Sequence, residues 1–304
     1  FSSGRYFLKH SHTYPFNIMT RQRNPFLRPY LKWAGGKRQL EGEILPKCPS
    51  KFNTYYEPFV GAGAILFALH PDRAVINDLN DQLCLTYMTI KDDVTELIKK
   101  LEEHKCNNSK EYYYSLREKD REPDFDTCST VDKAARLIYL NKTCYNGLYR
   151  VNSMGHFNTP YGRYETPAIF DEEVLLAIHK YFNTANITIR NMSFEKAVAD
   201  AEKGDFVYFD PPYDSPNCTN FTGYQAGGFD HEKQTLLKEV MDDLTDRKVK
   251  CLMSNAATDF IINLFKEKTR NKFKIETVSA NRMIGSNLDS RGKVDEVLIR
   301  NYNL

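Results

Sequence analysis

The sequence predicts an α/β fold in which a mainly parallel sheet is interrupted by a largely helical insert. Two patterns lead to this expectation. A strand, a glycine turn and a helix follow one another at 54–69, and short apolar strands alternate with helices again from 206 onward. The stretch between these two parts is mostly helical in its pattern and ends in a turn-rich segment.

The individual elements are assigned from apolar runs bounded by turn residues. Strands are expected at 54–59, 74–77, 206–209, 250–253 and 294–301, and helices at 65–69, 230–244 and 257–266. Residues 79–141 are expected to be mainly helical, with polar breaks at 107–109 and 122–127, and Asn146–Tyr164 to form a β-hairpin that turns at Ser153–Gly155. These elements divide the chain into a sheet domain at 19–84 and 186–304 and an insert at 85–185.

The first residues show none of these patterns. Phe1 is not an initiator, whereas Met19 is a candidate for one. We therefore expect 1–18 to be a leader or an added segment, and we draw no function from it.

The composition excludes several classes of protein. Hydrophobic residues make up 41% of the chain and charged residues 27%, and the longest apolar run, near Ala62–Leu69, is too short to cross a bilayer. The seven cysteines never occur in C-x-x-C spacing, and the histidines show no ligand spacing. We therefore expect a cytoplasmic, monomeric protein with no disulfide framework, no metal and no membrane partner.

Basic residues are concentrated in two parts of the chain, although the net charge is only +2. Six arginines and lysines and no acidic residue lie between Met19 and Leu40, and the stretch 140–164 combines three basic residues with five aromatic ones. Such faces suit a nucleic-acid backbone. Short runs without acidic residues also arise by chance, so charge alone leaves both interpretations open.

The first chemical motif is the glycine turn Glu57–Gly63, which reads EPFVGAG. Gly61 and Gly63 let the backbone approach a bulky ligand, and Asp78, seventeen residues beyond Gly61 at the end of the next strand, is placed to bind ribose hydroxyls. The third glycine of the dinucleotide fingerprint is missing, which favours an adenosine-type ligand such as S-adenosylmethionine. An ordinary tight turn is the alternative.

The second motif, Asp210-Pro211-Pro212-Tyr213, follows the apolar strand 206–209 directly. The prolines hold the chain extended, so that the Asp210 carboxylate and the Pro211 carbonyl can accept from the two N–H groups of one planar amine. Those two bonds would localise the amine lone pair and aim it at a methyl donor, while Tyr213 stacks on a base that has left the duplex. A proline-rich turn is the alternative.

Two further observations bear on the reaction. Methylation of cytosine carbon 5 needs a cysteine nucleophile, and Cys218 has no suitable Pro-Cys context, so transfer to nitrogen is favoured. The segment Pro29–Lys37 holds the only tryptophan, and we expect Trp33 to cover the cofactor, Lys37 to bind its carboxylate and Lys32 to reach DNA. Alternatively, Trp33 anchors the core and the lysines are merely solvated.

Taken in order along the chain, the motifs resemble the Dam family of DNA adenine-N6 methyltransferases, of the α-class and including the Dpn-type enzymes. The matching segments cover roughly residues 28–302: LKWAGGK at 31–37, EPFVGAG at 57–63, ND at 77–78, YNGLYRVN at 145–152, GHFNTPYGRY at 155–164, DPPY at 210–213 and SRGKVDEVLIRNY at 290–302. The resemblance implies a Rossmann-like, S-adenosylmethionine-dependent methyltransferase sheet of seven strands. It also implies a target-recognition insert, base flipping in double-stranded DNA, the sequence GATC and S-adenosylhomocysteine as product.

The resemblance also implies roles for individual residues. The residues that look like the cofactor site are Trp33, Ala34, Gly35, Lys37, Phe59, Gly61, Gly63, Asp78 and Asp210. Those that look like the DNA site are Lys32 at the outer guanine, Tyr145 and Asn146 in the space left by the flipped base, Leu148, Arg150 and Pro160 at base edges, and Tyr164. Hairpin packing is the alternative for Leu148, and a phosphate contact is the alternative for Arg150. Tyr149 and Val151 flank Arg150 and decide nothing.

Other functions remain to be weighed. An amino-methyltransferase acting on RNA or on protein would use a similar proline turn, and a non-catalytic DNA-binding descendant would keep the hairpin. A nicotinamide-dependent oxidoreductase is disfavoured by the missing glycine. A role in restriction-modification or in housekeeping is left open. The polar loop at 216–228 is expected to become ordered only with DNA or cofactor.

Overall fold

The computed structural model describes residues 24–33, 35, 37, 40–214, 229–266, 272–281 and 293–304, and the side chains of these residues except 279–281 and 293–294. The predictions for the leader at 1–18, for Ala34 and for the loop at 216–228 lie outside the described residues.

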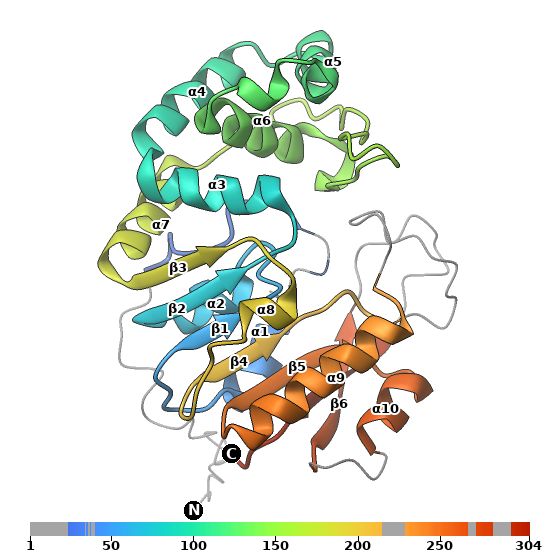
Figure 1. Ribbon diagram of the computed structural model, residues 1–304. Coiled ribbons are helices and arrows are strands. Elements are labelled where there is room, and N and C mark those ends of the chain that lie inside the picture. The colour runs from blue at the N-terminus through green and yellow to red at the C-terminus, as the bar shows by residue number, and fades with distance from the viewer. Residues whose placement is uncertain are drawn as a thin grey trace, which may run out of the picture.

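The sheet has seven strands in the order β3-β2-β1-β4-β5-β7-β6 (Figure 1). Neighbours are parallel except β7, which runs antiparallel to both β5 and β6. This confirms the predicted seven-stranded, mostly parallel α/β sheet. The bounds are β1 Tyr55–Glu57, β2 Arg73–Asn77, β3 Asn186–Arg190, β4 Phe206–Phe209, β5 Lys250–Ala256, β6 Lys274–Asn281 and β7 Lys293–Arg300.

Two of the strands, β3 and β6, were not predicted individually. Both lie at the edges of the sheet. In β3 only Ile187 is buried, whereas all four residues of the central strand β4 are buried. A half-exposed edge strand has no continuous apolar run, which is the pattern that predicted the central strands.

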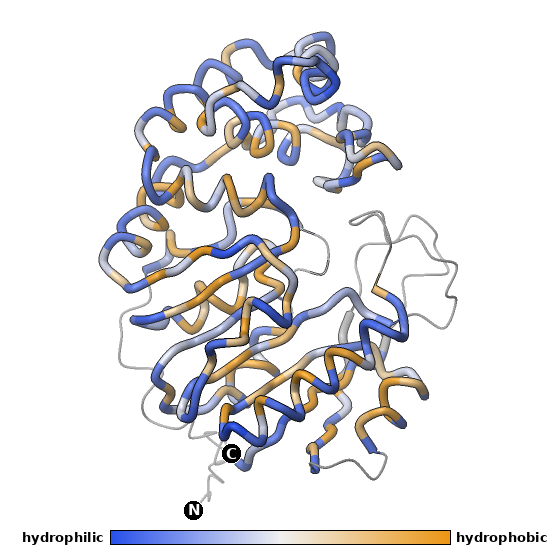
Figure 2. Tube along the Cα trace, in the orientation of Figure 1, coloured by the Kyte–Doolittle hydropathy of each residue, from blue (hydrophilic) through white to orange (hydrophobic). Residues whose placement is uncertain are grey.

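Successive strand residues point to opposite faces of the sheet, and two hydrophobic cores result. Tyr55 and Tyr208 face a core shared with α2 (Ala64–Leu69) and α7 (Glu172–Thr184). Tyr56 and Val207 face a second core shared with α8 (Phe194–Ala197), α9 (His231–Asp246) and α10 (Asp259–Lys266). Figure 2 shows the mainly hydrophobic strands between these layers. A short helix, α1 (Glu41–Ile44), and a 3-10 turn, η2 (Leu45–Lys47), precede β1.

The long helical stretch between β2 and β3 agrees with its prediction. It comprises α3 (Asp81–Asp92), α4 (Val94–Cys106), α5 (Lys110–Glu118) and α6 (Thr130–Thr143), with 3-10 turns η3 (Lys119–Arg121), η4 (Phe125–Thr127) and η5 (Tyr145–Gly147). The predicted polar breaks separate α4 from α5 and η3 from α6. In Figure 1, α4, α5 and α6 form a group apart from the sheet, and α3 lies between that group and β3. Helix α3 therefore crosses residue 85, the expected start of the insert, and contacts both parts.

The predicted hairpin is present as a short antiparallel ladder. Val151 and Phe157 form an antiparallel bridge, and the N–H groups of Asn152 and Asn158 donate to the carbonyls of His156 and Arg150, both at 2.9 Å. Gly155 takes a φ of 83°, which suits glycine at the turn. The hairpin thus turns where the sequence indicates.

Among the described residues we find neither a membrane-spanning helix nor a cluster of metal ligands. No helix among them is long and apolar enough to cross a membrane. No group of three or more His, Cys, Asp or Glu side chains in this part of the chain is arranged to hold a metal ion.

A buried histidine in the helical group predicts a pH effect on stability. His104 of α4 is 5% exposed, its Nδ1 lies 2.7 Å from the Tyr112 hydroxyl, and burial, with a smaller effect of Lys100, lowers its pKa to about 4. The stability contributed by neutral His104 is complete above the unfolded pKa of about 6.5 and is lost as pH falls toward 4. We expect this group to cost about 2 kcal/mol of unfolding free energy across that window.

Urea denaturation at pH 7 and pH 4.5 measures the effect. His104→Phe, which cannot titrate, should lose less stability over this interval than the unmodified chain. Equal losses in the two proteins would contradict the prediction.

Candidate active site and nucleic-acid interface

Strand β4 delivers Asp210 to the carboxyl end of the sheet, beside the neighbouring strand β5. Lys37 Nζ lies 2.9 Å from Asp210 Oδ1, and the buried Ser254 of β5 donates to the same oxygen at 3.0 Å. Burial raises the pKa of Asp210, whereas Lys37 and Ser254 act to lower it. Both contacts use Oδ1, so among the described residues Oδ2 is left to accept from a substrate. The predicted catalytic carboxylate and the predicted cofactor lysine therefore meet.

Tyr213 lies against the same lysine. Lys37 Nζ is 4.2 Å from the centroid of the Tyr213 ring, and the Tyr213 hydroxyl donates to Glu296 Oε2 of β7 at 2.6 Å. Burial, followed by Asp210 and Glu296, raises the pKa of Tyr213 well above its ordinary value, so its hydroxyl stays protonated and remains a donor at neutral pH.

The backbone around Tyr213 is held by two buried amide side chains that the sequence did not predict. Gln234 Nε2 of α9 donates to the Pro212 carbonyl at 3.1 Å, and Asn255 Oδ1 of β5 accepts from the Asp214 N–H at 3.1 Å. Asn255 Nδ2 in turn donates to Gln234 Oε1 at 3.0 Å. The motif is therefore anchored from two elements that lie far from it in the sequence.

The glycine turn and Asp78 also come together as predicted. Asp78 Oδ2 accepts from the Gly61 N–H at 3.1 Å, and Oδ1 accepts from the Asn80 N–H at 3.0 Å. Gly61 has a φ of 49°, and a Cβ there would lie 3.1 Å from Trp33 Cδ1. Gly63 has a φ of 75°, and a Cβ there would lie 2.9 Å from Phe67. Side chains at these two positions would be strained and crowded, which explains both glycines.

The chemistry of this turn fits an adenosine-type ligand. Burial raises the pKa of Asp78, while the N–H groups of Asn80 and Gly61 oppose that shift by stabilising the carboxylate. Each carboxylate oxygen can accept a further hydrogen bond from a ribose hydroxyl. Nearby, Phe59 stacks on Phe194 with centroids 5.3 Å apart. Gly35, also predicted in the site, accepts from Lys37 Nζ through its carbonyl at 3.0 Å.

Trp33 connects this turn to the hairpin. Its ring stacks on Tyr149 with centroids 5.0 Å apart and an interplanar angle of 27°. Tyr149 is 8% exposed and also packs edge-on against Phe157. The sequence assigned no role to Tyr149 because nothing local distinguishes it, and its part in the site depends on a partner more than a hundred positions away.

Asn141 joins the segment of Lys32 to the start of the hairpin. It lies at the end of α6 with 0% exposure, its Oδ1 accepts from the Lys32 N–H at 2.9 Å, and its Nδ2 donates to the carbonyls of Lys32 at 2.7 Å and Gly147 at 3.1 Å. Lys32 Nζ lies 5.3 Å from the ring centroid of Tyr164. Asn141, which the sequence did not predict, thus brings predicted DNA-binding residues together.

Replacement of Asn141 by alanine tests this junction. It leaves the backbone N–H of Lys32 and the backbone carbonyls of Lys32 and Gly147 without this partner, so we expect a loss of about 2–3 kcal/mol in the free energy of unfolding. Chemical denaturation measures it. The matched control is Asn107→Ala, an exposed asparagine whose Nδ2 donates to the Glu103 carbonyl at 2.8 Å, with an expected loss of about 0.5 kcal/mol or less. Equal losses would contradict the assignment.

The other predicted DNA-binding residues lie along one partly exposed segment. Tyr145 is 52% exposed, and its N–H donates to the Pro160 carbonyl at 2.8 Å. Asn146 has a φ of 55°, which is unusual for a residue with a side chain, and its N–H donates to the Tyr164 hydroxyl at 3.1 Å. Leu148 is half-buried rather than fully packed in the core.

Arg150 is exposed, and a neighbour on the opposite arm of the hairpin orients it. Its Nε donates to Asn158 Oδ1 at 2.8 Å. The same arm is fixed to the helical group, because Asp120 Oδ2 accepts from the Phe157 N–H at 2.7 Å and pairs with Arg136 at 2.9 Å. The Arg150 guanidinium is therefore positioned by a hairpin strand that is hydrogen-bonded to the helical group.

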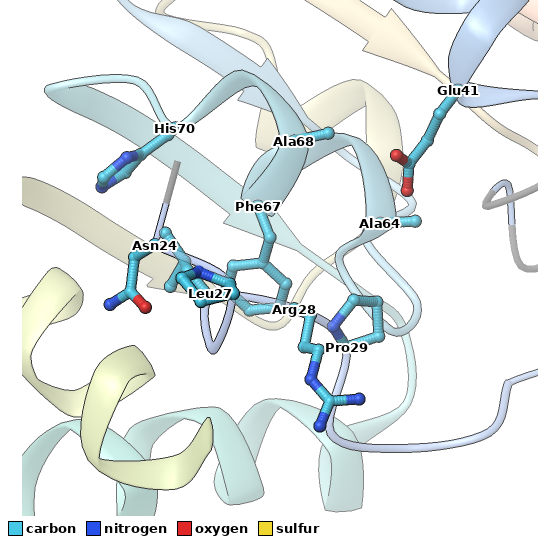
Figure 3. Close-up of a pocket in the computed structure, with 10 residues that line it drawn as sticks. Asn24, Leu27, Arg28, Pro29, Glu41, Ala64, Phe67, Ala68 and His70 are labelled. Atoms are coloured by element: carbon cyan, nitrogen blue, oxygen red, sulfur yellow. The ribbon is translucent and has the colours of Figure 1, made fainter. Parts of the chain in front are cut away.

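One cavity of the described residues lies away from this site. Its volume is about 300 Å³, and Figure 3 shows it between the segment 24–29 and helix α2. Arg28 at its edge pairs with Asp171 at 2.7 Å. None of the predicted catalytic or DNA-binding residues lines this cavity.

One family model and several known proteins are similar to this chain. Residues 33–284 match the family model described as D12 class N6 adenine-specific DNA methyltransferase. A type II methyltransferase of Lactococcus lactis subsp. cremoris, M1.LlaDCHI, is 44% identical over 277 residues, which cover 91% of this chain and 96% of that protein. M.MjaIII of Methanocaldococcus jannaschii is 39% identical over 91% of this chain and 99% of its own length. The DNA adenine methylase of Escherichia coli K12 is 34% identical over 89% of this chain and 94% of its own length.

Proposed function

Because the chain belongs to the D12 class of N6 adenine-specific DNA methyltransferases, we propose that it methylates adenine N6 within GATC in duplex DNA after the base has left the helix. The predicted family and enzyme class are confirmed by the matched model and by the relatives. That membership disfavours the oxidoreductase, the RNA or protein methyltransferase and the non-catalytic descendant. We also propose that the enzyme is a monomer and that it works in the cytoplasm.

The observation that carries the proposal is the arrangement at the end of β4. Asp210 is held through Oδ1 by Lys37 and Ser254, at 2.9 and 3.0 Å, and the prolines after it keep the chain extended. Asp210 Oδ2 and the Pro211 carbonyl accept one N–H each from the adenine amine. The lone pair of that amine is then withdrawn from the ring and directed at the methyl carbon, and Asp210 accepts the proton that the amine releases.

The proposed site for S-adenosylmethionine is the glycine turn with its neighbours. S-adenosylmethionine supplies, when bound, an electrophilic methyl carbon on a sulfonium. In this proposal Asp78 accepts from the ribose hydroxyls and Gly61 lets the backbone approach. Trp33 covers one side, and Lys37 binds the carboxylate. The ion pair between Lys37 and Asp210 supports a lysine that contacts both the cofactor carboxylate and the Asp210 carboxylate. No residue role in the proposal requires a metal.

The proposed DNA interface is the insert at 85–185, with Lys32 beside it. Tyr145 and Asn146 fill the space left by the flipped base. Leu148, Arg150 and Pro160 read base edges, and the target GATC rests on the match of these residue types to those of the Dam family. The contact between Trp33 and Tyr149 supports the proposal, because it joins the cofactor side of the site to the hairpin.

A plasmid digestion assay tests the function. Plasmid incubated with the protein and S-adenosylmethionine is cut with restriction enzymes that differ in their response to methylated GATC, and the nucleosides are analysed by mass spectrometry. The expected product is N6-methyladenine at every GATC. If N6-methyladenine forms but GATC sites stay unmethylated, adenine methylation stands and the target sequence is refuted. If RNA or protein is methylated and DNA is not, the whole proposal is refuted.

A further inference from the structure

Tyr213 is held by its backbone on both sides. The Pro212 carbonyl before it accepts from Gln234, and the Asp214 N–H after it donates to Asn255, each at 3.1 Å. Gln234 is 1% exposed and Asn255 is 0% exposed. These contacts fix where the side chain of Tyr213 begins, but they leave the direction of its ring undetermined.

The far end of the ring is held by a different strand. The Tyr213 hydroxyl donates to Glu296 Oε2 at 2.6 Å, within the range of short bonds to a charged acceptor. Glu296 is 5% exposed and lies opposite Ala256 in the pairing of β5 with β7. Strand β5 also carries Ser254, which donates to Asp210. The paired strands β5 and β7 therefore fix the positions of Asp210 and Tyr213 relative to each other.

We propose that Glu296 is a positioning residue for the methyl transfer, which fixes the ring of Tyr213 beside Asp210 before the target base arrives. The ring of a tyrosine anchored only at its backbone can swing between staggered rotamers. The Tyr213 ring also lies against Lys37, whose Nζ is 4.2 Å from the ring centroid, and Glu296 adds a hydrogen bond at the hydroxyl. A ring held at its hydroxyl loses that freedom before substrate binds, so the stacked complex forms in the reactive geometry. Glu296 acts through Tyr213, and it contacts neither the base nor the cofactor. This inference rests on the proposed function, because it requires adenine to stack on Tyr213.

The inference differs from a purely structural role, and kinetics separate the two. Glu296→Ala and Tyr213→Phe each remove one side of the same hydrogen bond. We expect each to lower kcat about tenfold, with little change in the KM for S-adenosylmethionine, and the double variant to be no slower than either single one. Glu296→Gln keeps an acceptor oxygen and should restore kcat to within about threefold of the unmodified chain. It also guards against a failure of Glu296→Ala to fold.

Base stacking gives a second readout. Duplex DNA with 2-aminopurine at the target adenine should show base fluorescence that is quenched on Tyr213 in the unmodified chain and less quenched in both single variants. The matched control is Tyr302→Phe. The Tyr302 hydroxyl donates to the Lys47 carbonyl at 2.6 Å, and the Tyr302 ring packs on Phe206 at the start of β4. This control should keep its full kcat.

Two outcomes overturn the inference, and they are distinguishable. If the unmodified chain methylates adenine but Glu296→Ala lowers kcat by the same factor in the Tyr213→Phe background, Glu296 does not act through the hydroxyl. If the unmodified chain transfers no methyl group to adenine in duplex DNA, the proposed function fails, and this inference fails with it.

Discussion

Replacement of Asp210 by alanine is expected to lower the rate of methyl transfer by about a thousandfold or more. The variant loses the carboxylate that we propose accepts from the amine, and removal of one well-placed hydrogen-bonding group in an active site costs about 10²–10³ in kcat. It also leaves Lys37, whose side chain is 7% exposed, without its carboxylate partner. The single-turnover transfer of a labelled methyl group to a GATC duplex measures the rate.

Loss of folding must be separated from loss of chemistry. Asp210→Asn keeps the size of the side chain and one acceptor oxygen, and an unfolding curve and a thermal shift with S-adenosylmethionine show whether each variant folds and binds. A folded Asp210→Ala variant with near-normal transfer would contradict the role of Asp210. The unmodified chain and both variants should be compared at saturating DNA, so that binding does not limit the rate.

The second large effect is expected at Arg150, whose replacement by alanine should relax the choice of sequence more than it slows transfer at saturating DNA. An arginine with two bonds to guanine O6 and N7 contributes about 1–3 kcal/mol of discrimination, so we expect the preference for the correct base to fall about 10- to 100-fold. In the structure Asn158 Oδ1 accepts from Nε at 2.8 Å and the Asn158 carbonyl accepts from Nη2 at 3.4 Å, so among the described residues Nη1 and the second N–H of Nη2 are left to face a base. The ratio of kcat/KM for the target and for a guanine-substituted duplex measures this preference.

A matched arginine controls for loss of positive charge. Arg73→Ala removes an exposed arginine at the amino end of β2, away from the carboxyl ends where Asp210 lies, and should change neither the rate nor the preference. A uniform loss of affinity for all sequences in Arg150→Ala, with discrimination unchanged, would instead assign Arg150 to a phosphate contact.

The sequence predicted those parts of the molecule whose signals are local. Strand β4 is continuously apolar, and Asp210 to Tyr213 follow it without interruption, so both the strand and the place of the motif at its carboxyl end were predictable. The glycine turn was predictable for the same reason, since Gly61 lies in the turn after β1, Asp78 directly follows β2, and neighbouring parallel strands bring their carboxyl ends together.

Residues that act through distant contacts were not predictable from a single sequence. Tyr149 becomes part of the site only because Trp33 stacks on it, and Asn141 only because Lys32 lies beside α6. Gln234 and Asn255 lie in unremarkable stretches of a helix and a strand, and only the fold brings them to Pro212 and Asp214. Glu296 lies within the segment 290–302 that resembles the Dam family. Its contact with Tyr213 depends on the pairing of β7 with β5, which the sequence does not reveal.

The structure of the protein in complex with S-adenosylhomocysteine and a GATC duplex tests the central claim most directly. The account predicts an adenine turned out of the helix, with its N6 about 3 Å from both Asp210 Oδ2 and the Pro211 carbonyl, and its ring against Tyr213. An adenine that remains stacked in the duplex, or an N6 that faces other groups while Asp210 stays bound only to Lys37, would contradict it.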